Sequence, residues 1–422
     1  MPRGFHLLIA AQFFSALADN ALLIVAIALL HERQMAPWLA PLLKFGFTLA
    51  YVVFAPVLGP LADAMPKGRL MAWMNGVKVL GVASLLAGVH PVAGLCIVGL
   101  GAAAYAPAKY GLITEIVPAR QLVAANGWIE VSVVCAVLMG TVCGGLLVSP
   151  WWLGSAVVDA ARQAGIPSAL LVSLAALLAV YALAALLNLG VPDSGARYPR
   201  RSVHPVLLLR DFARANRVLW RDAEGGLSLA VTTIFWGVGA TLQFIVLRWA
   251  AEQLQLPLSQ AAYLQGVVAV GVVVGAAVAG RWVPLSAARH MLVFGVILGL
   301  AMPLLAPVDS LWLAVPLLVL VGAVGGLLVV PLNALLQHRG CQLLSAGRSI
   351  AVQGFNENAS VLAMLAAYAG LVALDLPLPV LMTGFGLAVA LALMLLMLRE
   401  WRRDPGSGPA GWLARARLRS GR

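Results

Sequence analysis

The feature that most constrains this chain is a series of twelve apolar stretches, each long enough to cross a membrane as a helix. About 20 helical residues are needed to cross roughly 30 Å of hydrocarbon. The chain of 422 residues is 62% hydrophobic and 10% charged, which is more apolar surface than a soluble domain of this length can bury. The sequence therefore predicts an all-α integral membrane protein with twelve transmembrane helices. The stretches cover residues 5–30, 41–61, 70–89, 92–113, 122–148, 167–190, 226–250, 259–281, 290–308, 311–336, 348–372 and 377–398.

The distribution of basic residues predicts the orientation of these helices. An even number of crossings places both termini on one side, and the loops on that side hold most of the Lys and Arg residues. The opposite loops keep only Arg33 and Arg162. The positive-inside rule therefore predicts that both termini are cytoplasmic. The formal charge of +12 comes from basic residues in the loops between apolar stretches and not on a surface that could bind in the groove of a nucleic acid. Nucleic acid is therefore not an expected partner.

Two segments of the first half return in the second half. The string Pro107-Ala108-Lys109 corresponds to Pro331-Leu332-Asn333. The string from Asn126 to Glu130 corresponds to the string from Gln353 to Glu357. Parallel repeats with polar groups at matching places are typical of two-lobed transporters whose site lies between the lobes. We expect two six-helix pseudo-symmetric lobes at 1–190 and 226–398, a basic cytoplasmic linker at 191–225 and a basic cytoplasmic tail at 399–422. Within the linker, 207–220 has the spacing of a helix lying on the membrane surface.

Ionisable residues within the apolar stretches are the first candidates for function, because a charge at the bilayer centre costs a few kcal/mol. Asp19 is about fourteen residues, or roughly 21 Å of helix, into the first stretch. No base lies within helical reach of it in that stretch, so its partner must be another helix, a cation or the substrate. Lys109 and Glu130 fall at similar depths on adjacent stretches. They can form a functional ion pair or a packing pair that only fixes helix register.

In the second half the corresponding positions are Asn333 and Glu357, so this glutamate lacks the matching base. Glu357 can be protonated, pair across the lobes or help to bind a cation. Lys78 and Arg248 lie closer to stretch ends, where a long side chain can instead reach out to the membrane surface. The sequence contains no pattern typical of a catalytic or metal site, so we predict that the protein is not an enzyme. The candidates for binding substrate or cation are Asp19, Asn20, Lys109, Glu130, Gln243, Arg248, Asn333 and Glu357.

Glycines recur in several stretches at the spacing of helix contacts. Gly140, Gly144 and Gly145 follow this pattern, as do Gly271, Gly275 and Gly280, and Gly322, Gly325 and Gly326. Such small residues let two backbones approach closely. We therefore interpret these glycines as packing positions and not as part of a chemical site.

The loop between the second and third stretches reads Gly59-Pro-Leu-Ala-Asp-Ala-Met-Pro-Lys-Gly-Arg69. It resembles the cytoplasmic loop motif of the major facilitator superfamily. That resemblance implies that Asp63 caps a neighbouring helix and that Lys67 and Arg69 pair across the bundle, as a gating loop. The alternative is an ordinary charged turn.

Longer strings resemble one family within that superfamily, the lysophospholipid transporter (LplT) family. The resemblance implies a bacterial inner-membrane protein that carries lysophospholipids, chiefly lysophosphatidylethanolamine, from the outer to the inner leaflet. There an acyltransferase partner would restore the second acyl chain. One departure is Gln243, where the family pattern often has a base after Thr-Leu, and Arg248 follows five residues later. The matching strings are Ala11-Gln12-Phe13, Asp19 to Leu23, Gly101 to Gly111, Ala125-Asn126-Gly127, Phe235-Trp236-Gly237, Val330 to Gln337, Ala351-Val352-Gln353 and Glu357-Asn358.

The sequence thus predicts alternating-access transport of lysophospholipid in a lipid membrane, with no cofactor. Coupling to sodium or protons is left open. One alternative is a proton-coupled transporter of small solutes or drugs that uses Glu130 or Glu357. A second is a scaffold that does not transport and that docks an acyltransferase through the 191–225 linker.

Overall fold

The computed structural model describes residues 3–35, 39–196, 198, 204–256, 258–374 and 376–403. Over these residues the regular structure is helical, and no strand is found among them. The predicted basic tail from 404 onward and the linker residues 197 and 199–203 lie outside this description. The helical result follows from the composition, because a backbone surrounded by lipid must satisfy its hydrogen bonds within each segment.

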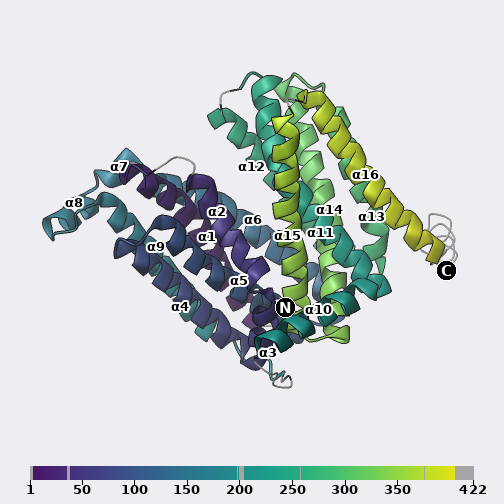
Figure 1. The fold of residues 1–422 in the computed structure, drawn as a ribbon, viewed down its shortest axis with the longest axis horizontal. Coiled ribbons are helices and arrows are strands. Elements are labelled where there is room, and N and C mark those ends of the chain that lie inside the picture. Colours follow the sequence, from purple (N-terminus) through teal and green to yellow (C-terminus); the bar gives the residue numbers. More distant parts are fainter. Residues whose placement is uncertain are drawn as a thin grey trace. The chain divides into compact units, whose positions relative to one another are not determined.

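Sixteen α-helices and two 3₁₀ helices make up the described chain (Figure 1). The first ten α-helices and one 3₁₀ helix are α1 (Arg3–Glu32), α2 (Leu39–Val53), α3 (Ala55–Ala64), α4 (Lys67–Leu86), α5 (Pro91–Ile116), η1 (Ala119–Gln121), α6 (Leu122–Leu147), α7 (Pro150–Leu153), α8 (Ala156–Gln163), α9 (Ala169–Leu189) and α10 (Pro205–Arg221). The remainder are α11 (Ala223–Glu252), α12 (Leu258–Trp282), η2 (Leu285–Met291), α13 (Leu292–Leu305), α14 (Leu311–Leu343), α15 (Ala346–Ala373) and α16 (Leu378–Arg403).

Each of the twelve predicted stretches falls on a helix or on two consecutive helices. By length and hydropathy, nine of the described helices can cross a membrane, or ten if the bent pair α2–α3 counts as one crossing. Helices α4 and α15 have 20 and 28 residues and are long enough, although they are not among these nine. The expectation of an all-α membrane protein is confirmed.

The pair α2–α3 is bent by 66°. The break falls at Phe54, and Pro56 occupies the first turn of α3. Proline has no amide hydrogen to donate to the preceding turn, so it fits the start of a new helix better than the middle of an old one. The bend separates α2 from the short helix α3, which carries Asp63.

The described chain divides into two compact units. Unit 1 comprises Met1–Pro118, Ser132–Leu219 and Gln337–Asn358, and unit 2 comprises Ala119–Val131, Trp220–Leu336 and Ala359–Arg422. Helices α6, α10, α14 and α15 contribute residues to both units. The units are groups of residues that are compact in space, so the lobe boundaries inferred from the repeat stay a prediction.

In unit 1, α4 packs against α5 and α9, and α1 packs against α9, α5 and α2 (Figure 1). The core between them is aliphatic and includes Leu22, Leu85 and Leu174. Close approach of α6 to α1 depends on the predicted glycines, since a side chain on Gly140 or Gly144 would meet the backbone of α1. This confirms the interpretation as packing positions for Gly140 and Gly144, whereas a side chain on Gly145 would meet nothing within 4 Å.

In unit 2, α13 packs along α16, and α11 packs against α12 and α16. The core is centred on the buried indole of Trp249. Gly271 and Gly275 of α12 face the backbone of α14, while Gly322 and Gly326 of α14 face the backbone of α12. The two helices therefore touch backbone to backbone, which larger residues at these positions would prevent.

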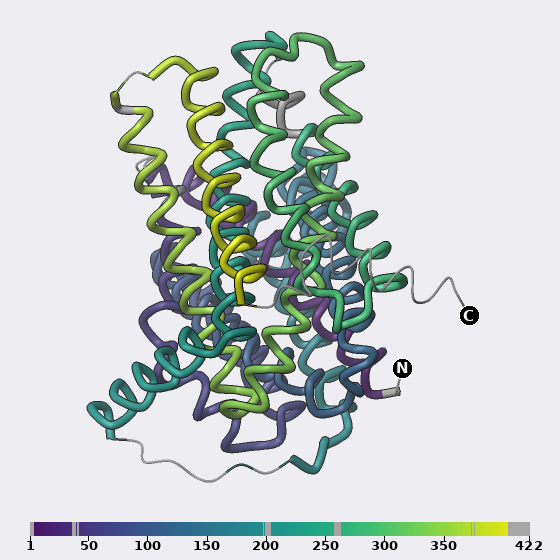
Figure 2. The backbone as a smooth tube through the Cα atoms, turned by 90° about the vertical axis from the view of Figure 1, so that its right-hand side faces the viewer, coloured from purple at the N-terminus to yellow at the C-terminus, as the bar shows by residue number. Residues whose placement is uncertain are grey.

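Helix α10, teal in Figure 2, lies within the linker and is amphipathic. It buries Leu208, Ala215 and Leu219 and leaves its arginines exposed. Its Phe212 ring packs edge to face on Phe355 of α15, with centroids 5.2 Å apart. The predicted helix in the linker is therefore present, whereas its position on a membrane surface stays a prediction.

Candidate functional site

A polar stripe along α1 is the basis of the first candidate site. Gln12, Ser15 and Asp19 are spaced by three and four residues and therefore share one face of the helix. Gln12 and Ser15 are buried within unit 1. Hydrophobic packing does not require polar side chains at these positions. The groups that hydrogen-bond to Gln12, Ser15 and Asp19 therefore indicate the role of the stripe.

Lys78 of α4 is the partner of Asp19. Its Nζ lies 2.9 Å from Oδ1 and 2.7 Å from Oδ2 of Asp19, and 2.9 Å from Oγ of Ser15. The Tyr181 hydroxyl of α9 donates a third hydrogen bond to Oδ1 of Asp19, at 2.7 Å. Lys78 is only 2% exposed, so the interpretation that it reaches out to the membrane surface is wrong. The partner of Asp19 is another helix, which was one of the three partners that the sequence left open.

A second lysine, Lys109 of α5, also contacts the polar stripe of α1. Its Nζ donates to Oε1 of Gln12 at 2.9 Å and lies 4.3 Å from the ring centroid of Tyr110. Gln12 in turn donates to Oγ of Ser132 on α6 at 3.2 Å. Gln12 was not among the sequence candidates, although its spacing of three residues to Ser15 and seven to Asp19, on one helix face, could have identified it.

Glu130 and Asn20 complete the candidates from the first half. Glu130 is buried in the part of α6 that belongs to unit 2, whereas Lys109 belongs to unit 1. The ion pair expected between them stays a prediction. Asn20 donates its amide to the carbonyl of Ala16, one turn back in α1.

The candidates from the second half are dispersed over several helices. Asn333 is buried in α14, and Glu357 of α15 accepts a hydrogen bond from Gln353 at 2.8 Å. Gln243 of α11 exchanges hydrogen bonds with Gln265 of α12. Arg248 pairs with Glu252 one turn further along α11 at 2.6 Å, with both side chains partly exposed. Their roles in binding substrate or cation stay predictions.

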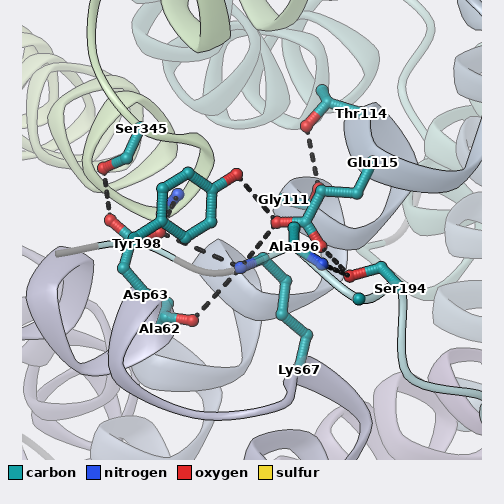
Figure 3. Close-up of polar contacts among 12 residues, drawn as sticks. Ala62, Asp63, Lys67, Gly111, Thr114, Glu115, Ser194, Ala196, Tyr198 and Ser345 are labelled. Atoms are coloured by element: carbon teal, nitrogen blue, oxygen red, sulfur yellow. Dashed lines mark hydrogen bonds and ion pairs between the residues drawn. The ribbon is translucent and has the colours of Figure 1, made fainter.

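A second polar cluster forms around the loop motif, as Figure 3 shows. Asp63 accepts hydrogen bonds from the Ser345 hydroxyl and, at 2.9 Å, from the backbone N–H of Gly347. These groups lie at the first turn of α15, where backbone N–H groups have no partner inside the helix and where the helix dipole favours a negative charge. The expectation that Asp63 caps a neighbouring helix is confirmed.

Lys67 occupies the centre of this cluster. Its Nζ forms an ion pair with Glu115 of α5 at 2.8 Å and lies 3.9 Å from Asp63. Side-chain exposure is 4% for Lys67 and 5% for Glu115. Arg69, by contrast, is exposed. The gating role of the loop stays a proposal.

Sequence reasoning missed Glu115 and its partners in the linker. The Glu115 carboxylate accepts hydrogen bonds from the hydroxyls of Ser194 and Tyr198 (Figure 3). The Tyr198 ring also lies under Lys67, with Nζ 4.9 Å from its centroid. Burial and the charge of Glu115 raise the pKa of Tyr198, which therefore stays a neutral donor. An acid at the end of α5 was a signal, because the motif lysine needs a counter-ion.

The match to known proteins covers most of the chain. The family model of the Major Facilitator Superfamily matches residues 8–355. Two solved structures share the fold. A bacterial homologue of the iron transporter ferroportin in an outward-facing state has a TM-score of 0.71 at 14% identity and covers 94% of this chain and 99% of its own. The Escherichia coli fucose:proton symporter FucP has a TM-score of 0.69 at 16% identity and covers 94% of this chain and 98% of its own. The chain is therefore a multi-pass membrane protein with the major facilitator fold.

Closer relatives define the family within that fold. Lysophospholipid transporter LplT of Yersinia enterocolitica is 40% identical over 89% of both chains. Lysophospholipid transporter LplT of Escherichia coli K12 is 39% identical over 91% of this chain and 92% of its own. This protein belongs to the lysophospholipid transporter LplT family of the major facilitator superfamily.

Proposed function

We propose that this protein transports lysophospholipids across a bacterial inner membrane by alternating access and is not an enzyme. The observation that carries the proposal is the identity of about 40% to LplT proteins over nine-tenths of the chain. The site chemistry is compatible with it. A lysolipid has a phosphate and, in the ethanolamine form, an ammonium group, so its headgroup needs both cationic and anionic or polar contacts.

Candidate contacts for such a headgroup lie in both halves of the chain. Lys109 would meet the phosphate, with Arg248 or Gln243 as a second contact on α11. Glu130 and Glu357 would meet the ammonium group, with Asn20 and Asn333 beside them. Asp19 is paired with Lys78 of α4 and would act beside these groups. An apolar route between helices would carry the single acyl chain, which has no place in a sealed cavity for small solutes.

The gating loop supports alternating access. Asp63 ties the motif to the start of α15, some 280 residues further along the sequence. Within this proposal, that contact holds one side of the transporter closed and breaks when the site opens to that side. By the positive-inside rule, we propose that this side, with both termini, faces the cytoplasm. Transport would then run from the outer to the inner leaflet, where a lysophospholipid acyltransferase consumes the product.

The test uses purified protein in liposomes whose outer leaflet contains labelled lysophosphatidylethanolamine. We expect rapid protein-dependent inward movement of the lysolipid, with diacyl phosphatidylethanolamine left behind. Lys109→Ala should slow this movement at least about tenfold, since one lost charge-assisted hydrogen bond to a phosphate is worth about 1.5–3 kcal/mol. Lys44→Ala, on the exposed side of α2, is the matched control and should move lysolipid at the normal rate.

The competing function is proton-coupled transport of a small solute through Glu130 or Glu357, as in other members of the superfamily. It predicts no lysolipid movement by the wild-type protein. It also predicts solute uptake that follows a proton gradient. Failure of the wild type in the liposome assay, with correctly inserted protein, would favour this alternative over lysolipid transport.

A further inference from the structure

Three side chains form a row along one face of α11, toward the end of that helix. Phe244, Arg248 and Glu252 are spaced by four residues, so successive members lie on neighbouring turns, about 6 Å apart along the helix axis. Phe244 is 46% exposed, and the side chains of Arg248 and Glu252 are 30% and 44% exposed. The row therefore runs from an apolar ring through a cation to an anion at the last residue of α11.

Tyr368 of α15 lies beside two members of this row. Its ring centroid is 6.4 Å from that of Phe244, and its hydroxyl contacts the guanidinium of Arg248. Both contacts lie near the ends of α11 and α15, so the two helices end on the same side of the membrane. In the proposed orientation this side is opposite both termini. Because the predicted apolar stretch of α11 ends at residue 250, Arg248 and Glu252 lie at the depth of the outer-leaflet headgroups.

The order of charges in the Arg248–Glu252 pair is unfavourable for α11 itself. The last turn of a helix carries the negative end of the helix dipole, so a base is preferred there and an acid is repelled. At a spacing of four residues, the acid before the base is also the better order. Nε of Arg248 donates to the carboxylate at 2.6 Å, while Nη1 has no hydrogen-bond partner within the described part of the chain. Helix stability therefore does not account for the pair, and Nη1 is left for another anion.

The order of groups along the row is complementary to that of a phosphoethanolamine lipid. From the membrane outward, such a lipid presents an acyl chain, a phosphate anion and an ammonium cation. In the same direction the row presents Phe244, Arg248 and Glu252. A guanidinium binds phosphate through charge-assisted hydrogen bonds, and a carboxylate pairs with an ammonium. The rings of Phe244 and Tyr368 give one apolar track, which suits a lipid with a single chain.

Resting on the proposed function, we propose that this row and Tyr368 form an outer capture site for lysophosphatidylethanolamine, which the headgroup occupies before it reaches Lys109. Arg248 binds the phosphate, Glu252 binds the ammonium, and the rings of Phe244 and Tyr368 hold the start of the acyl chain. The site selects ethanolamine over glycerol headgroups, because a glycerol headgroup has no cation to balance Glu252. Diacyl phosphatidylethanolamine presents the same headgroup, so the test includes it.

The test follows inward movement of lysophosphatidylethanolamine and of lysophosphatidylglycerol in phosphatidylcholine liposomes, at lysolipid concentrations well below saturation. Glu252→Gln should slow the ethanolamine lipid about fivefold, which is the upper end of what a partly exposed charge contact contributes, and should not slow the glycerol lipid. Arg248→Gln should slow both by about fivefold, since both lipids have a phosphate. At saturating lysolipid these differences should shrink, because capture precedes translocation. Equal slowing of both lipids by Glu252→Gln would overturn the proposal.

An exchange of the two charges separates capture from a purely structural ion pair. The double variant Arg248→Glu with Glu252→Arg keeps both charges at the same spacing and in the better order for the helix, but it reverses the order that the lipid meets. We expect it to move lysophosphatidylethanolamine at least as slowly as Arg248→Gln does. A wild-type rate in this variant would overturn the proposal, because the pair would then only anchor α11 at the membrane surface. Arg162→Gln, which removes the base of the exposed Arg162–Asp159 pair of α8, is the control and should leave both rates unchanged.

Binding of labelled lipids to the purified protein in detergent separates this proposal from the function on which it rests. The wild type should bind lysophosphatidylethanolamine about fivefold more tightly than lysophosphatidylglycerol or diacyl phosphatidylethanolamine, and Glu252→Gln should lose the preference over the glycerol lipid. Equal binding of the diacyl lipid would make the row a site for bulk membrane lipid and overturn the proposal. If the wild type binds as expected but moves no lysolipid, the proposed function fails and the capture site stands. If it moves lysolipid and the variants change neither binding nor rate, the function stands and the capture site fails.

Discussion

Unit 1 contains two lysine–carboxylate pairs that are alike in geometry and different in what they connect. Nζ–O distances are 2.7 Å in Lys78–Asp19 and 2.8 Å in Lys67–Glu115, and both lysines are almost fully buried. The first pair is completed by Tyr181, so its members come from helices of the first half alone. The second is adjacent to Asp63, which holds Ser345 and Gly347 from the second half.

This difference separates a permanent contact from one that can open. On the proposed mechanism the two halves of the chain rock against each other, so contacts inside one half can persist through the cycle. Contacts that join α3 to the start of α15 must break and form again. We therefore assign positioning to the Lys78 pair and gating to the cluster around Lys67.

The largest expected effect on stability is found by comparing two separate variants, one without Lys78 and one without Lys67. Lys78→Met leaves the Asp19 carboxylate without its counter-ion and with the Tyr181 hydroxyl as a donor, and should lower the unfolding free energy by about 3–5 kcal/mol. Lys67→Met should cost only about 1–2 kcal/mol, because Glu115 keeps the hydroxyls of Ser194 and Tyr198 as donors. Thermal unfolding in detergent measures both. Equal losses would remove the distinction between the two pairs.

An intermediate effect is expected from Asp63→Ala, which removes an acceptor for the N-terminal turn of α15. The loss should be about 1 kcal/mol, as for other helix caps. Because the cap joins the two halves of the chain, its removal should also loosen the contact between α3 and α15. Maleimide labelling of the partly buried Cys341, with the other three cysteines replaced, should therefore become faster. Arg69→Ala, in the same loop but exposed, should leave the labelling rate unchanged, and an unchanged rate in Asp63→Ala would contradict the gating role.

The smallest effect is expected from removing one hydroxyl in each region. Tyr181→Phe and Tyr198→Phe each delete a single hydrogen bond to a carboxylate, worth about 0.5–1.5 kcal/mol. We expect Tyr181→Phe to be the more damaging to stability, because Tyr181 is fully buried whereas Tyr198 is partly buried. Tyr198→Phe should instead act on the labelling rate of Cys341. If Tyr198→Phe instead had the larger effect on stability and Tyr181→Phe the larger effect on the labelling of Cys341, the Tyr198 hydroxyl would support the fold and not the gate.

Much of the architecture could be read from the sequence. Helix formation at all twelve stretches followed from hydropathy and length, and the packing role of Gly275 and Gly322 followed from their spacing. The cap by Asp63 was implied by the resemblance of its loop to a superfamily motif, whose residues lie within a few positions of each other. All of these depend on short-range patterns, which a sequence displays directly.

The partners of buried charges could not be read in the same way. Sequence alone established that Asp19 needed a partner, because a carboxylate in an apolar helix cannot stay uncompensated. It could not choose among a helix, a cation and the substrate, and it assigned Lys78 equally well to the membrane surface. Glu115 and Tyr198 were not singled out at all, since both look like ordinary residues near the ends of crossings.

The sequence by itself determined that this chain is a multi-pass helical membrane protein, which loops carry its positive charge and which family it resembles. These properties depend on the free energy of placing each segment in lipid or water, which adds up residue by residue. Only the tertiary structure decided that Lys78 neutralises Asp19, that Gln12 holds Lys109 and that Glu115 joins the gating loop to the linker. These pairings depend on the rotation and depth of helices that are tens to hundreds of residues apart, which packing alone sets.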